Sequence, residues 1–236
     1  MGELRVRSVL VTGANRGIGL GLVRHLLGLP NPPEWVFAAC RDPKGKQAQE
    51  LQNLASKHPN LVIIPLEVTK PASIKAAAAS IGERLKDSGL NLLINNAGML
   101  VYKTLDTETQ EDMAQVYATN TIGPLLLSQV RPPPQLQEHP SSSMAPSPPH
   151  PDPCGVSLQA ALNMLTKCQS LGYREHGILC AVFHPGWVQT DMGNTAGDKP
   201  PVTVDESVGG MLKVMSSLSE KDTGTFLDWE GKVVPW

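Results

Sequence analysis

The chain has 236 residues, of which 41% are hydrophobic and 4% aromatic, and this is enough for one large α/β domain with a buried core. The formal net charge of −2 provides no basic excess for a nucleic acid or an anionic membrane. The four cysteines are scattered without a CxxC pair, which argues against a disulfide framework and a zinc site. We see no signal-peptide core, lipidation motif or membrane-spanning apolar run, so we expect a cytoplasmic protein without metal.

Apolar runs without polar alternation predict strands, and stretches with helical spacing separate most of them. In chain order the strands are predicted at Ser8–Thr12, Trp35–Cys40, Leu61–Leu66, Leu90–Asn95, Ile178–Phe183 and Thr225–Asp228. Helices are predicted at Ile18–Leu27, Lys46–Lys57, Ser73–Lys86 (with Ser73 as N-cap), within Thr109–Gln129, and at Ser157–Leu171 and Asp205–Ser217. This alternation predicts a single α/β domain over residues 1–236 with a doubly wound, Rossmann-like parallel sheet.

A proline- and serine-rich segment, Arg131–Pro153, interrupts this alternation. Proline removes backbone donors, so the segment is expected to form neither a helix nor a central strand. Its composition predicts an exposed, polyproline-like or disordered loop. It also contains PxxP at Pro146–Pro149 and Pro148–Pro151, which could dock an SH3 or WW groove, although a spacer loop explains the composition more simply.

A glycine-rich turn lies between the first predicted strand and the first predicted helix. It runs Thr12-Gly13-Ala14-Asn15-Arg16-Gly17-Ile18-Gly19. Its glycines let the backbone turn tightly and approach a pyrophosphate, and the helix N-terminus behind them offers N–H groups and partial positive charge. Strand, glycines and helix are in register, which favours a dinucleotide-binding turn over a plain turn. The expected cofactor contacts here are Gly13, Asn15, Arg16, Gly17, Ile18 and Gly19.

Other motifs follow in order along the chain. The third predicted strand is followed by Glu67-Val68, and the fourth leads into Asn95-Asn96-Ala97-Gly98. The long helix contains Asn120. The strand that ends at Phe183 is followed by Pro185-Gly186-Trp187-Val188-Gln189-Thr190. With the TGxxxGxG spacing, these motifs resemble the short-chain dehydrogenase/reductase family over nearly the whole chain except Arg131–Pro153. Within that family the chain looks most like carbonyl reductases of the C-factor and sniffer type.

The resemblance implies a role for each of these residues. Asn96, Ala97 and Gly98 would lie near the cofactor ribose, and Pro185, Gly186, Val188 and Thr190 would hold the nicotinamide end. Glu67 and Val68 would flank the adenine, although the family usually has Asp in place of Glu67. Asn120 would support the catalytic water relay as the family's helix-four Asn.

Charge favours NADP(H) as the cofactor. An NAD-selective site places a carboxylate at the end of the second strand, where it holds the ribose 2′-OH. Here that strand is followed by Arg41, and Arg16 lies in the glycine-rich turn. Two guanidiniums suit a 2′-phosphate, whereas Asp42 is the residue that could serve NAD instead.

The catalytic residues that the resemblance implies are missing. In the family a Tyr donates the proton and a Lys four residues later lowers its pKa; in this chain Gly155 and Gln159 occupy those positions. None of the three tyrosines has a Lys four residues on. The family's serine ends a fifth strand, which we expect to be absent, and Ser141, Ser142, Ser143 and Ser147 are expected to be solvated loop residues.

Without a fifth strand the sheet would have a gap of about 4.8 Å, one strand spacing. Buried unpaired backbone groups cost roughly 1–3 kcal/mol each, so we expect Ile178–Phe183 to move across and pair with Leu90–Asn95. For the same reason, restoring Tyr and Lys at positions 155 and 159 is not expected to restore activity.

The sequence therefore predicts an NADP(H)-binding homologue of carbonyl reductases with impaired or absent catalysis. The alternatives are a non-enzymatic nucleotide-binding or interaction protein that uses the proline-rich loop, and an active enzyme with an unrecognised proton donor. The expected partner is a small-molecule carbonyl substrate if the chain is active. Family members are often dimers or tetramers, so the resemblance also allows a homo-oligomer.

Overall fold

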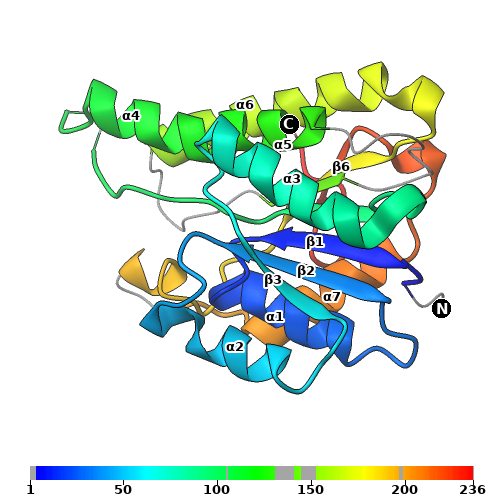
Figure 1. The fold of residues 1–236 in the computed structure, drawn as a ribbon. Coiled ribbons are helices and arrows are strands. Elements are labelled where there is room, and N and C mark those ends of the chain that lie inside the picture. The colour runs from blue at the N-terminus through cyan, green and yellow to red at the C-terminus, as the bar shows by residue number, and fades with distance from the viewer. Residues whose placement is uncertain (1–3, 105, 131–140, 145–152, 197–198, 236) are drawn as a thin grey trace.

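One sheet of seven parallel strands forms the centre of the computed structural model, in the order β3-β2-β1-β4-β5-β6-β7. The structure describes residues 4–104, 106–130, 141–144, 153–196 and 199–235, with the backbone alone described for 87, 141–144, 153–159 and 196. Helices α1, α2 and α7 cover one face of the sheet, and α3 to α6 lie on the other (Figure 1). The predicted doubly wound parallel arrangement is confirmed.

Six of the seven strands lie where the apolar runs predicted them, to within two residues. They are β1 Ser8–Thr12, β2 Trp35–Cys40, β3 Leu61–Pro65, β4 Leu92–Asn95, β6 Cys180–His184 and β7 Thr225–Asp228. Most of their residues are buried, because helices cover both faces of a parallel sheet.

The main helices are α1 Gly17–Leu27, α2 Gln49–Ala55, α3 Pro71–Leu85, α4 Gln110–Tyr117, α5 Gly123–Gln129, α6 Pro153–Gly172 and α7 Val204–Met215. At α3 two details differ from the sequence prediction. Helix α3 begins earlier, with Lys70 as N-cap and Pro71 in its first turn, where a missing N–H costs nothing. The Ser73 hydroxyl instead accepts a hydrogen bond from the Glu67 backbone N–H at 2.9 Å.

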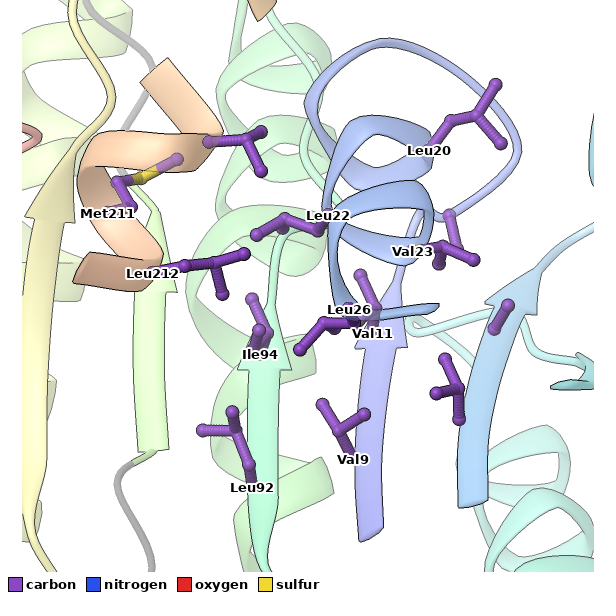
Figure 2. Packing of buried hydrophobic residues seen from close by; sticks show 14 of the residues in the cluster. Val9, Val11, Leu20, Leu22, Val23, Leu26, Leu92, Ile94, Met211 and Leu212 are labelled. Atoms are coloured by element: carbon purple, nitrogen blue, oxygen red, sulfur yellow. The ribbon is translucent and has the colours of Figure 1, made fainter. Parts of the chain in front are cut away.

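The larger apolar core lies between the sheet and helices α1 and α7. Val9 and Val11 of β1 and Leu92 and Ile94 of β4 project toward Leu22 and Leu26 of α1, with Met211 and Leu212 of α7 beside them (Figure 2). Because α1 packs over β1 and β2, the glycine-rich turn at its start is fixed above the carboxyl end of β1.

A fifth strand is present, so the expected replacement of this strand by a loop, with Ser141, Ser142 and Ser143 in that loop, and the expected gap in the sheet were wrong. Strand β5, Ser141–Met144, lies between β4 and β6, and Ser142 pairs with Ile94 on one side and with Ala181 on the other. The expected direct pairing of Ile178–Phe183 with Leu90–Asn95 is therefore wrong too. Within the proline-rich segment, residues 141–145 contain no proline, so their backbone keeps the N–H donors that a central strand needs.

The rest of the predicted Arg131–Pro153 loop has no structural description apart from Pro153, where α6 begins. Residues 131–140 and 145–152 lie outside the described ranges, and so do the two PxxP motifs and Ser147.

Candidate functional site

The strand order reverses between β1 and β4, because the chain proceeds outward from β1 to β3 and then returns to place β4 on the other side of β1. In doubly wound sheets a crevice for ligands opens at this point, outside the carboxyl ends of the strands. The glycine-rich turn follows β1, the Asn96–Gly98 segment follows β4, and Arg41 follows β2. The topology therefore brings three of the sequence motifs to one edge of the sheet.

Two glycines make the turn after β1 possible. Gly13 has a φ of +63°, and a Cβ on it would lie 2.9 Å from Cα of Ala97. A Cβ on Gly19 would collide with the Gly13 carbonyl oxygen and come within 2.5 Å of Nδ2 of Asn96. The turn and the segment after β4 are thus as close as backbones can pack, and only glycine fits at these positions.

Side-chain hydrogen bonds join the ends of β1 and β4. Nδ2 of Asn96 donates to the carbonyl oxygens of Thr12 and Gly13 at 2.8 and 3.2 Å. Oγ1 of Thr12 accepts from the backbone N–H groups of Asn96 and Ala97 at 3.0 and 2.9 Å. The Asn96 side chain is therefore used to hold the turn in place, whereas the backbone of the segment borders the crevice.

The N-terminus of α1 is available for an anion. Arg16 is its N-cap, yet no side chain caps the first turn and the first turn holds no acidic residue. The partial positive charge and the free N–H groups there favour a phosphate. Arg16 and Arg41 are both exposed beside this edge of the sheet, and Asn15 and Ile18 are partly buried in the turn.

Asp42, the residue that could favour NAD, takes part in a local turn. Its Oδ1 accepts a hydrogen bond from the Lys44 N–H at 3.2 Å, and its carbonyl oxygen accepts one from Gly45. The carboxylate is also close enough to Cys40 that, after burial itself, its charge raises the pKa of that thiol. The hydrogen bonds of Asp42 thus go to Lys44 and Gly45 of the same loop.

After β3, the Glu67 carboxylate accepts hydrogen bonds from the N–H and hydroxyl of Thr69 at 3.3 and 3.1 Å. Val68 is buried, and a Cβ placed on Gly123 of α5 would lie 3.1 Å from the Cβ of Val68. The described contacts of both residues are thus within the protein, and their expected position beside an adenine remains a prediction.

The Pro185–Thr190 segment is anchored from both sides. The buried hydroxyl of Ser207 on α7 donates to the Pro185 carbonyl oxygen at 2.6 Å, and Gly186 turns with a φ of +83° against the indole of Trp229. Val188 forms a parallel bridge with Val202. A Cβ on Gly17 would lie 3.4 Å from Cγ2 of Thr190, so this segment and the glycine-rich turn face each other at contact distance.

Asn120 lies in a π-helical turn, η3 Ala118–Ile122, which separates α4 from α5. Its amide clamps one residue: Oδ1 accepts from the Met99 N–H and Nδ2 donates to the Met99 carbonyl oxygen, both at 2.9 Å. The single long helix predicted here is thus divided by a wider turn, a feature frequent at functional sites. Asn120 positions the segment after β4.

Helix α6 begins at Pro153, so Gly155 and Gln159 lie in its first turns. Nearby elements carry buried polar atoms that have no partner in the described part of the chain: Oδ1 of Asn95 on β4, Oγ1 of Thr121 on η3, Oδ1 of Asn163 on α6 and Nδ1 of His184 on β6. Such atoms occur where a ligand or water completes the structure. Burial lowers the pKa of His184, although the charge of Asp228 opposes this.

Two contacts at the site were not predicted from the sequence. Nη1 of Arg16 forms an ion pair with Oδ2 of Asp191 at 3.1 Å, and the Tyr102 hydroxyl lies 3.5 Å from the Met192 carbonyl oxygen. Both link the segment after Thr190 to the opposite side of the crevice. The TDM sequence after Gln189 contains no spacing signal that would reveal them.

Two general findings bear on the site. Within the described ranges we find no cluster of three or more His, Cys, Asp or Glu side chains arranged to hold a metal ion. None of the described helices has the length and apolar character required to cross a bilayer.

Comparison with known proteins agrees with the motifs. The sequence pattern of the family described as short chain dehydrogenase matches residues 7–140. An uncharacterised oxidoreductase of Schizosaccharomyces pombe is 30% identical, with 96% of each chain covered. The C-signal protein of Myxococcus xanthus is 34% identical over 62% of this chain and 93% of its own length.

Solved structures give the same family. An NADPH-bound carbonyl reductase from chicken fatty liver is 61% identical, with a TM-score of 0.91, and the match covers 99% of this chain and 100% of that one. The carbonyl reductase Sniffer of Drosophila melanogaster is 31% identical, with a TM-score of 0.86 and coverage of 98% and 100%. This chain belongs to the short-chain dehydrogenase/reductase family of oxidoreductases and resembles its carbonyl reductases.

Proposed function

We propose that the chain binds NADP(H) at the crevice between β1 and β4 and that its carbonyl reductase chemistry is impaired. The cofactor part depends on the crevice itself, and the catalytic part on Gly155 and Gln159.

The observation that carries the cofactor proposal is the fit of the crevice to a nucleotide with a 2′-phosphate. Gly13 and Gly19 let the turn after β1 pack against the segment after β4, α1 presents an uncapped N-terminus, and Arg16 and Arg41 provide two guanidiniums at the same edge. Planar guanidiniums bind phosphate bidentately, so NADP(H) is favoured over NAD(H). The likeness to an NADPH-bound carbonyl reductase supports the same choice.

The remaining cofactor contacts are assigned by position. Gly13, Asn15, Arg16, Gly17, Ile18 and Gly19 would surround the pyrophosphate, Asn96, Ala97 and Gly98 the ribose, and Glu67 and Val68 the adenine. Pro185, Gly186, Val188 and Thr190 would contact the nicotinamide end.

Bound NADPH would supply a hydride for a carbonyl carbon. The chain's own residues would then have to provide a proton to the carbonyl oxygen. Gly155 has no proton to give, and Gln159 carries no charge to lower the pKa of a donor. Both hydrogen bonds of the Asn120 amide go to the Met99 backbone, so Asn120 positions the segment after β4. We therefore expect reduction to be slow or absent.

Thermal unfolding with each nucleotide tests the cofactor proposal. At 100 times its Kd a ligand stabilises the folded state by about 2.7 kcal/mol, equivalent to roughly 5–10 °C in Tm for a domain of this size. NADPH should give such a shift at lower concentration than NADH, and Arg41→Gln should reduce the NADPH shift. Arg84→Gln on α3 removes a guanidinium whose hydrogen bonds within the described residues go to Ser80, and it should leave the NADPH shift unchanged.

NADPH oxidation with a panel of aldehydes and quinones tests the catalytic proposal. We expect turnover to be slow or absent, with Gly19→Ala, which should lose cofactor binding, as the background control. Turnover at an ordinary enzyme rate would refute the impairment, and a lack of any Tm shift with either nucleotide would refute the cofactor assignment. The alternative function through the proline-rich segment gains no support, since its PxxP motifs lie outside the described residues.

A further inference from the structure

The ion pair between Arg16 and Asp191 crosses the opening of the proposed cofactor crevice. Arg16 lies at the start of α1, and Asp191 follows Thr190, the last residue of the segment that faces the glycine-rich turn. Nη1 of Arg16 and Oδ2 of Asp191 are 3.1 Å apart. The same guanidinium is one of the two that we assign to the 2′-phosphate.

Of the two partners, Asp191 has the more firmly held backbone. Around Asp191 the backbone is fixed by a tight set of bonds: the Thr190 N–H donates to Val188 at 2.8 Å, the Gly193 N–H to Oγ1 of Thr190 at 3.0 Å, and Nε1 of Trp187 to the Gly193 carbonyl oxygen at 2.9 Å. Arg16, in contrast, is joined to its helix by a long side chain with several rotatable bonds. Because the backbone of Asp191 is held and the Arg16 side chain is longer, a guanidinium that turns toward a phosphate moves away from Asp191.

We propose that Asp191 is a specificity-determining residue that competes with the cofactor's 2′-phosphate for Arg16. This inference rests on the proposed function. NADPH has to break the ion pair to gain its arginine, whereas NADH has no 2′-phosphate and leaves the pair intact. Asp191 thus weakens the binding of NADPH more than that of NADH and sets how strongly the chain prefers one over the other.

Exposure makes the competition modest and reversible. The side chains of Arg16 and Asp191 are 51% and 80% exposed, and ion pairs as exposed as this contribute little in water. Removing the carboxylate should therefore change NADPH affinity by about two- to fivefold. The effect falls on selectivity, because the 2′-phosphate is the only difference between the two nucleotides.

Calorimetric titration with NADPH and NADH tests the proposal. The variants are Asp191→Asn, Arg16→Gln and the two combined, with Glu50→Gln as a matched control. Glu50 pairs with Arg24 at 3.6 Å, with exposures of 57% and 53%, so its substitution removes the same charge from a similar pair elsewhere. Asp191→Asn should lower the Kd of NADPH about two- to fivefold and raise the ratio of the NADH Kd to the NADPH Kd. Glu50→Gln should leave that ratio unchanged.

The double variant separates competition from a general charge effect. In the Arg16→Gln background, Asp191→Asn should no longer change the ratio, since there is no guanidinium to release. An equal change with and without Arg16, or no change in the ratio for Asp191→Asn in a protein that still prefers NADPH, would overturn this inference and leave the proposed function intact. If the unsubstituted protein bound neither nucleotide, the proposed function would fall and this inference with it.

Discussion

Gly19 offers the sharpest test at the scale of single residues, because no side chain fits there. A Cβ would collide with the Gly13 carbonyl oxygen and with the Asn96 amide. Gly19→Ala should lower the free energy of unfolding by about 1–3 kcal/mol, as overpacking does, and should also abolish NADPH binding. Urea denaturation and nucleotide titration measure the two effects.

Gly82 supplies the control for that substitution. It lies inside α3, and nothing lies within 4 Å of a Cβ placed on it. Gly82→Ala should therefore leave the protein as stable or stabilise it by about 0.5–1 kcal/mol, since alanine favours the helix. Equal losses at positions 19 and 82 would mean that the close approach of the turn to Asn96 is not what makes Gly19 necessary.

The cysteines are predicted to differ in reactivity. Burial raises the pKa of Cys180 to about 12, and burial followed by the charge of Asp42 raises the pKa of Cys40, while Cys168 is exposed on α6. The thiolate is the reactive form, so of these three thiols Cys168 alone should react quickly with a thiol reagent at pH 8. A Cys154→Ser background removes the one thiol outside the described side chains, and Cys168→Ser on that background should abolish the fast phase.

Histidine 184 should make stability depend on pH. Burial holds its pKa below the ordinary value of about 6.5, so the unfolded chain takes up a proton more readily than the folded one. The free energy of unfolding should therefore fall as pH decreases from about 6.5 toward the lower pKa of the folded state. In His184→Gln, the free energy of unfolding measured by urea denaturation should change less between pH 7 and pH 5.5. A pH dependence as steep as that of the unsubstituted protein would contradict this.

At the scale of elements, β5 is the strand on which the sheet depends. It satisfies backbone groups of β4 on one side and β6 on the other, through Ser141, Ser142 and Ser143. Ser142→Pro should prevent folding, because proline removes a donor and cannot occupy a central strand. Ser142→Val, which has the higher β propensity, should be tolerated. Circular dichroism and gel filtration compare the two, and a folded Ser142→Pro protein would mean that β5 is dispensable.

Elements with strong local signals were predictable from the sequence. The limits of β1, β2 and β7 follow from apolar runs that end at turn residues, and the start of α1 follows from its glycines. Strand β5 was missed because its residues, SSSM, have low apolarity and lie among prolines, and two neighbouring strands decide their conformation. The π-turn at Asn120 was missed because it depends on bonds to Met99, 21 residues earlier.

At the scale of the whole molecule, the proposed site is assembled from segments more than 170 residues apart. Arg16 and Asp191 meet because β1 and β6 belong to one sheet, with their carboxyl ends at the same edge. The motifs predicted which segments gather there, since each follows a strand. Which side chains would contact each other across the crevice was not predictable, because sequence spacing carries no information about rotamers.

The presence of β5 also changes what a repair of the catalytic pair should do. The expectation that Gly155→Tyr with Gln159→Lys would fail assumed that the strand was missing. With the serine-bearing strand between β4 and β6, the double variant should gain roughly 10²-fold or more in NADPH oxidation with an aldehyde or quinone, the range for an added general acid. Each single variant should gain far less, because the tyrosine needs the lysine to lower its pKa. Gly155→Phe with Gln159→Lys is the control without a hydroxyl. If the double variant bound NADPH but oxidised it no faster than this control, the impairment would extend beyond Gly155 and Gln159 to the serine strand itself.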